Sequence, residues 1–141
     1  MVLENFEIGL DGISFYKYGQ NLDLHNNYDL ISFSYDIACR NIRLVWKLSD
    51  GHWVPDDLPK TLTFSLLSVY LFKARERSQE VAFTEDSCLE SIGFIWNDKI
   101  DEFEGYAKHQ PSAECNHLNI NFQSGLAIKV GAEKAILICQ V

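Results

Sequence analysis

The stretch from Lys60 to Phe72, KTLTFSLLSVYLF, constrains the fold more than any other part of the chain. Polar and apolar residues alternate from Thr61 to Leu66, which is the period-2 pattern of a half-buried strand. The alternation shifts by one residue at Leu66–Ser68, where a β-bulge would keep the later side chains on the correct face. At roughly 3.3 Å per residue this strand would run about 40 Å, long enough to cross one sheet and bend into a second. We therefore expect it to be the central strand of an antiparallel β-domain.

Similar alternation predicts further strands along the chain. The clearest runs from Tyr28 to Ala38 and is expected to form a hairpin with Ile42–Lys47, with one buried and one solvated face. Other strands are predicted at Phe6–Leu10, Ile13–Tyr18, Leu89–Asn97, His117–Phe122, Leu126–Val130 and Ala135–Val141, with a weak edge strand at Glu104–Lys108. About seven to nine short strands with little helix are typical of a β-sandwich or a flattened barrel.

The same pattern predicts which side chains form the core. In the Tyr28–Ala38 strand the apolar side chains are expected to share the buried face; they are Ile31, Phe33, Tyr35 and Ile37. Elsewhere the largest buried side chains are expected to be Leu44, Trp46, Phe64, Leu66, Phe94, Ile120, Phe122 and Ile138. Gly93 interrupts its strand and indicates a bulge or a close approach of another segment.

Composition limits the class of protein. A chain of 141 residues that is 47% apolar suits one domain, residues 1–141, with a core of its own. The net charge of −8 opposes binding to nucleic acid, because phosphate contacts need clustered lysine and arginine. No apolar run approaches the roughly 20 residues of a membrane helix. Residues 1–12 contain acids and no basic residue, unlike a signal peptide, so a cytoplasmic location is expected.

The four cysteines are scattered without a CxxC motif, so they are expected to be reduced. One group, His109, Cys115 and His117, offers the residue types of a zinc site, and the last two would share a strand face. A fourth ligand is missing nearby, and the spacing matches no compact zinc module. Surface histidines are the simpler interpretation, and we expect neither a metal nor a cofactor.

Two regions contain candidate binding residues. The Ser49–Pro59 loop combines a histidine and a tryptophan with acids, which would suit acid–base chemistry or ligand stacking; its candidates are Asp50, His52, Trp53, Asp56 and Asp57. The simpler interpretation is a connecting loop whose tryptophan caps the end of the core. The most acidic region flanks the Leu89–Asn97 strand; its candidates are Glu85, Asp86, Asp98, Asp101, Glu102 and Glu104. An acidic surface favours a basic partner, whereas the simplest function of such charge is solubility. The two halves of the acidic set would converge only if the chain folds back after Asn97.

Three parts of the sequence carry a resemblance to a known family. They are the Trp46 to Phe72 block, the strand Ser91–Phe94, and the ending HLNINFQSGLAIKVGAEKAILI at His117–Ile138. In strand order and aromatic positions they resemble the small acidic all-β immunity proteins of bacterial polymorphic toxin systems, of the immunity-protein-50 type. The resemblance implies a cytosolic protein that binds and blocks a toxin without catalysis of its own. That family has no shared catalytic signature, so no site residue is transferred.

The sequence thus leaves several functions open. The first is a non-enzymatic protein-binding module, immunity-like, with an acidic surface for a basic toxin domain. The second is a small-molecule or carbohydrate-binding β-sandwich, or a hydrolase on that scaffold, using Trp53 or Tyr106 with nearby acids. The third is a structural domain, either a monomer or a homodimer paired through an edge strand. The absence of a recognisable nucleophile motif, metal set or phosphate loop favours the first.

Overall fold

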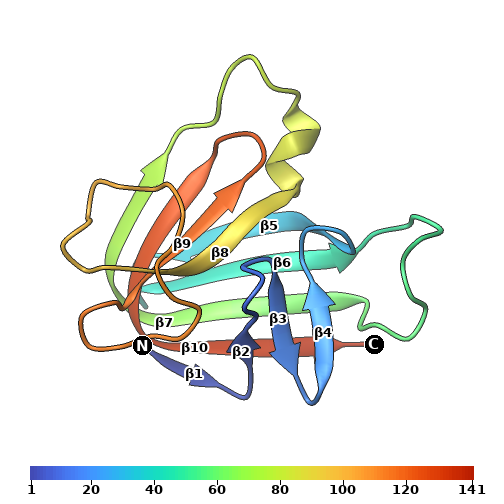
Figure 1. Cartoon of the computed structure of the whole chain (residues 1–141), viewed down its shortest axis with the longest axis horizontal. Coiled ribbons are helices and arrows are strands. Elements are labelled where there is room, and N and C mark those ends of the chain that lie inside the picture. The colour runs from blue at the N-terminus through green and yellow to red at the C-terminus, as the bar shows by residue number, and fades with distance from the viewer.

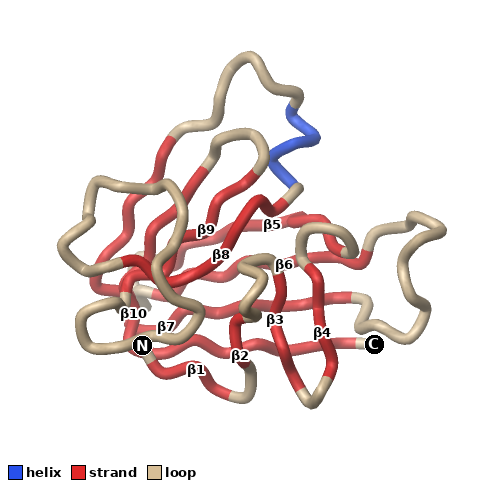
Figure 2. Tube along the Cα trace, viewed as in Figure 1, coloured by secondary structure: helices blue, strands red, loops and turns tan.

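The structure is a computed structural model that describes all 141 residues, and it is built almost entirely of strands (Figures 1 and 2). The strands are β1 (Val2–Glu4), β2 (Glu7–Ile8), β3 (Ser14–Lys17), β4 (Gln20–Asp23), β5 (Tyr28–Asp36), β6 (Asn41–Leu48), β7 (Thr61–Arg75), β8 (Leu89–Ile95), β9 (His117–Phe122) and β10 (Ala127–Gln140). One short 3-10 helix, η1 (Phe83–Ser87), precedes β8. The predicted all-β class, with little helix, is confirmed. No helix has the length and apolar character that crossing a membrane requires.

The larger sheet contains seven strands in the order β5-β6-β7-β10-β9-β8, with β1 added in parallel to β10. β7 lies between β6 and β10, as expected for a central strand, and β10 is only one residue shorter. Both long strands continue from one half of the sheet into the other, and Figure 1 shows them curving as they do so. The curl brings the start of β8 to the turn before β5, where His25 Nδ1 and Leu89 O lie 2.6 Å apart.

A bulge marks the bend in β7. The ladder pairs Val69 with Ala132 and Leu71 with Gly131, so Tyr70 is left as the extra residue. The predicted bulge therefore exists, but it lies at Val69–Leu71, just beyond Leu66–Ser68. Gly131 is required opposite it, because a Cβ there would lie 2.5 Å from the Tyr70 ring. The sequence predicted two separate strands, Leu126–Val130 and Ala135–Val141, whereas β10 is one strand that passes through Gly131.

A second sheet of three strands, β2-β3-β4, covers one half of the larger sheet. β3 and β4 run across β6, β7 and β10 in Figure 1. The ring of Phe15 of β3 packs against those of Phe64 and Trp46, with centroids 5.0 and 6.0 Å away, and the ring of Phe6 also packs against Phe64. These contacts belong to one continuous cluster of 27 buried apolar residues. β4 was not among the predicted strands, because it is short and Leu22 is its only apolar residue.

The other half of the larger sheet is covered on its outer face by the segment from residue 96 to residue 116. Lys129 is fully buried there, and its ammonium donates to the carbonyls of Lys99, Ile100 and Glu102. Tyr106 lies over Gly93, where a Cβ would be 2.4 Å from the ring. The predicted close approach at this glycine is therefore confirmed. The expected edge strand at Glu104–Lys108 is reduced to a single bridge between Lys108 and Phe94.

The predicted core is correct except at the edge of the sheet. Seven of the expected side chains are buried: Leu44, Trp46, Phe64, Leu66, Phe94, Ile120 and Phe122. The β5–β6 hairpin forms as predicted. However, the side chains expected on the buried face of this strand are not covered, since Ile31, Phe33 and Ile37 are exposed and Tyr35 is only half-buried. Within β5 only Tyr28, at its start, is fully buried. Ile138 is also half-exposed, on the outer face of β10. For β5 the physical reason is that it is the last strand on its side of the sheet, so no further strand flanks it.

Candidate partner-binding surfaces

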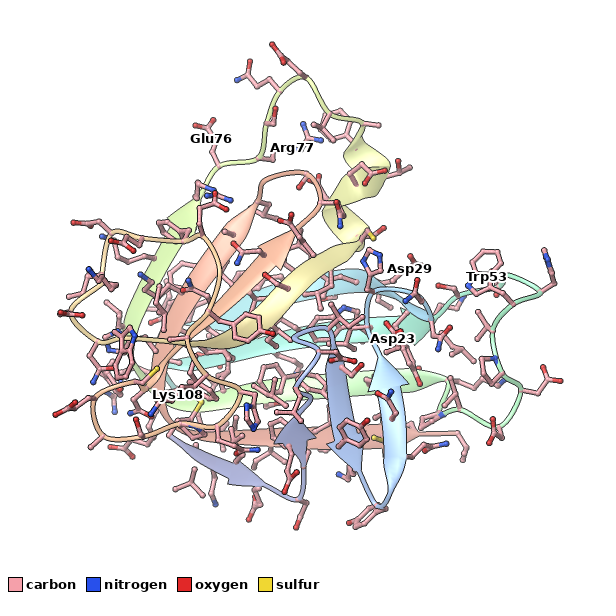
Figure 3. The ribbon with its side chains drawn as sticks, viewed as in Figure 1. Asp23, Asp29, Trp53, Glu76, Arg77 and Lys108 are labelled. Carbon is pink, nitrogen blue, oxygen red and sulfur yellow. The ribbon has the colours of Figure 1, made fainter.

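The fold brings the two acidic segments to the same row of basic residues. Successive outward residues at the end of β7 and beyond it form this row, which consists of Lys73, Arg75 and Arg77. Each of the three forms an ion pair: Lys73 with Asp101, Arg75 with Glu104 and Arg77 with Asp86. Figure 3 shows Arg77 at the tip of the molecule, near η1. Glu102 forms a further, local pair with Lys99 at 3.7 Å.

These pairs neutralise most of the predicted acidic cluster. The hydrogen bond and charge of Lys73 lower the pKa of Asp101. A hydrogen bond from Ser124, together with Arg77, lowers the pKa of Asp86. Of the six candidate acids, Glu85 and Asp98 alone have no ion-pair partner. The cluster is therefore a mixed-charge surface, and its field on a distant basic partner is weak.

A different acidic surface forms where the β6–β7 loop folds back onto the β4–β5 turn. The indole nitrogen of Trp53 donates to the carbonyl of Asn26 at 2.9 Å. The hydroxyl of Ser49 donates to the carboxylate of Asp29 at 2.8 Å. Figure 3 shows Trp53 at one end of the molecule, with Asp23 and Asp29 on the adjoining segment. Asp23 and Asp29 are thus brought to the loop that carries an exposed tryptophan.

We define the acidic Trp53 surface as Asp23, Asp29, Asp50, Trp53, Asp56 and Asp57. All five ion pairs of the protein lie elsewhere, so none of these carboxylates has an ion-pair partner. Trp53 is 61% exposed although its indole nitrogen is already bonded. A hollow of about 260 Å³ lies beside the loop, and Lys47 and Lys60 contribute the basic groups that line it. Five acids against two lysines leave this end of the molecule negative.

The loop does not assemble an acid–base pair. The His52 ring lies edge-on to Trp53, with centroids 5.7 Å apart, and it forms no hydrogen bond with any of the neighbouring acids. The ring of Trp53 instead covers Gly51, where a Cβ would be 2.2 Å from it. Of the predicted loop residues, the structure therefore groups the tryptophan with the acids and leaves His52 without a chemical partner.

One pairing was not predicted from the sequence. The thiol of Cys88 lies 3.7 Å from Nδ1 of His25, across 63 positions of the chain. The same nitrogen lies 2.6 Å from the carbonyl of Leu89, which can only accept a hydrogen bond, so Nδ1 carries the proton. It is then unable to take a proton from the thiol. Burial, with Glu85 and Asp29 nearby, raises the pKa of Cys88, which is the reverse of thiol activation. His25 is therefore a half-buried structural contact.

The three predicted zinc-type residues are separated. Cys115 is buried in the apolar core, His117 is buried on the outer face of β9, and His109 lines a hollow of about 450 Å³ beside Tyr16. No group of three histidine, cysteine or acidic side chains is placed to hold a metal ion. Comparison of the chain with protein-family models, curated proteins and solved structures finds no match.

Proposed function

We propose that this protein is a non-enzymatic protein-binding module and that the acidic Trp53 surface contacts a basic partner. The observation that carries the proposal is that an exposed tryptophan and five carboxylates without ion-pair partners lie on one loop and the segment that this loop contacts. Tryptophan is the residue most enriched among side chains that dominate binding energy at protein interfaces. Trp53 is held in place by its bond to Asn26, so little conformational freedom is lost when a partner covers it.

Electrostatics support a basic partner in particular. The protein has a net charge of −8, and the five acids of this surface form no ion pair and outnumber the two neighbouring lysines, Lys47 and Lys60. Complementary charge mainly accelerates the encounter of two proteins, and salt screens it over a Debye length of about 8 Å at physiological ionic strength. Covering of the tryptophan, in contrast, controls how long the complex lasts. The two contributions predict separable kinetic effects.

The resemblance to immunity proteins supports a toxin domain as the partner class. In that case the protein blocks the toxin by occupying its surface in the cytoplasm, and no reaction is performed by this chain. The probe for the proposal is the protein encoded by the gene next to this one, purified and immobilised. Association and dissociation rates are then measured at low and at physiological salt.

Two triple variants remove the same number of negative charges from different surfaces. Asp50→Asn, Asp56→Asn and Asp57→Asn together act on the acidic Trp53 surface. The matched control, Asp98→Asn, Asp101→Asn and Glu102→Gln, acts on the mixed-charge surface. We expect the first variant to slow association severalfold at low salt and the control to leave it within twofold of the parent. Thermal melting confirms that both are folded.

The tryptophan is tested separately. Trp53→Ala should increase the dissociation rate at least tenfold with little change in association, since Trp53 is uncharged. If the control triple variant slows association more than the loop variant, the binding surface is the one that contains Asp98, Asp101 and Glu102. If the immobilised protein does not bind at all, the proposed partner class is wrong.

A further inference from the structure

β5 is the most exposed long strand in the protein, although its sequence has the clearest strand pattern. Its four central residues, 31–34, are exposed on both faces of the sheet. Ile31, the extra residue of the bulge in this strand, is 59% exposed, and Phe33, two positions further along, is 42% exposed. Tyr35 and Phe33 extend the apolar surface to Phe72 of β7, with ring centroids 5.3 and 6.0 Å from it. Contiguous exposed apolar surface of this kind marks an interaction site.

The backbone edge of β5 is also free. β5 pairs with β6 on one side, and on the other side it has no strand and forms no backbone hydrogen bond. The helix η1 approaches β5 without bonding to its backbone. Natural sheets protect such edges with lysine, proline or a covering segment. The sequence of β5, YDLISFSYD, contains neither lysine, arginine nor proline, and its one bulge lies between Leu30 and Ser32.

We propose that β5 binds an extended segment of a protein partner, which continues the larger sheet by one strand and carries basic residues at its ends. An extended strand is the occupant that satisfies a row of free backbone N–H and C=O groups, and the side chains at Ile31, Phe33 and Tyr35 would contact alternate residues of it. This inference rests on the proposed function, because it specifies how the partner binds.

Charge distinguishes such a partner from a second copy of this protein. Asp29 and Asp36 stand near the two ends of β5 and have no ion-pair partners. Antiparallel pairing of two β5 strands over this length sets Asp29 of one copy against Asp36 of the other at both ends. Parallel pairing sets each aspartate against its equivalent. Like charges directly opposite one another destabilise a pair of strands. Asp29 also belongs to the acidic Trp53 surface, so a partner bound there reaches the start of β5.

The probe is a synthetic peptide of alternating valine and threonine with two lysines at each end. Its control has the same centre with glutamates in place of the lysines. Binding is measured by fluorescence anisotropy, and hydrogen exchange of the β5 amides is followed by mass spectrometry. We expect the lysine peptide to bind at least tenfold more tightly than the glutamate peptide and to slow exchange within residues 31–36.

Two variants with the same chemical change locate the site. Ser34→Lys places a charge on the exposed part of β5, and Ser112→Lys places it on an exposed loop. The first should weaken peptide binding at least tenfold and the second less than twofold. Equal effects of the two variants, or binding without protection of β5, would refute strand addition. Analytical ultracentrifugation of the parent gives the remaining outcome: a dimer that Ser34→Lys dissociates would assign the edge to a second copy.

These results are independent of the test in the preceding section. Suppose that the neighbouring gene product binds in a manner sensitive to Trp53, while Ser34→Lys has no effect on it or on the peptide. Strand addition would then be wrong and the protein-binding function would stand. Conversely, peptide binding at β5 without any binding of the neighbouring product would overturn the proposed partner class and retain the strand site.

Discussion

Truncation of Phe64 should destabilise the protein by about 3–5 kcal/mol, the range observed for buried phenylalanines replaced by alanine. Phe64 is fully buried between the two sheets, and its ring lies 5.0 Å from that of Phe15 and 5.6 Å from that of Phe6. Burial of roughly 150 Å² of apolar surface at about 25 cal/mol per Å² corresponds to about 4 kcal/mol. The neighbouring strands on both sides limit collapse of the cavity, so little of this loss should be recovered.

Phe33→Ala is the matched control, because it removes the same side chain from the same sheet. Phe33 is 42% exposed on β5, and its one aromatic contact is the stacked ring of Phe72 at 6.0 Å. Removal of this ring leaves an open surface instead of a closed cavity. The expected loss is about 1–2 kcal/mol, from one aromatic pair and partial burial.

Urea unfolding of both variants, followed by circular dichroism, gives the two free energies of unfolding with their m-values. Phe64→Ala should lower the denaturation midpoint two to three times as much as Phe33→Ala, with m unchanged. Equal losses would show that Phe33 is as well packed as Phe64. That result would contradict the exposure of the Phe33 side chain on β5, on which the strand-addition proposal depends.

Two further predictions concern pH and metals. Burial, and secondarily the charge of Lys129, lower the pKa of His117 from its ordinary 6.5, so below that pH the unfolded chain binds more protons than the folded protein. The free energy of unfolding should therefore fall as pH drops below about 6.5, and part of that fall should be absent from His117→Gln in urea titrations at several pH values. EDTA should leave the melting temperature unchanged, because the candidate ligands lie apart and no metal site is formed. If a structural zinc were present, its removal would lower the free energy of unfolding and hence the melting temperature. Stoichiometric metal in an elemental analysis would contradict this expectation.

The sequence by itself determined the class of fold and most of the strands. Alternation of polar and apolar residues specifies which face of a strand is buried, and this local pattern places Phe64, Leu44 and Ile120 in the core as observed. It also predicted a central strand with a bulge, because a change of phase within one strand has few other structural solutions. Such properties depend on neighbours in the chain, which a single sequence contains.

The tertiary structure decided which strand is at the edge and which charges meet. The polar–apolar alternation of β5 is the same as that of a central strand. Alternation shows that the two faces of a strand differ, but it does not show whether another segment covers the apolar face or pairs with the edge. The ion pairs of Asp101 with Lys73 and of Asp86 with Arg77 join residues from separate segments, so the sequence showed their acids as one negative cluster. The acidic Trp53 surface likewise exists only because one loop folds onto a distant turn. Coverage and charge pairing are long-range properties, and for that reason only the folded chain defines the candidate site.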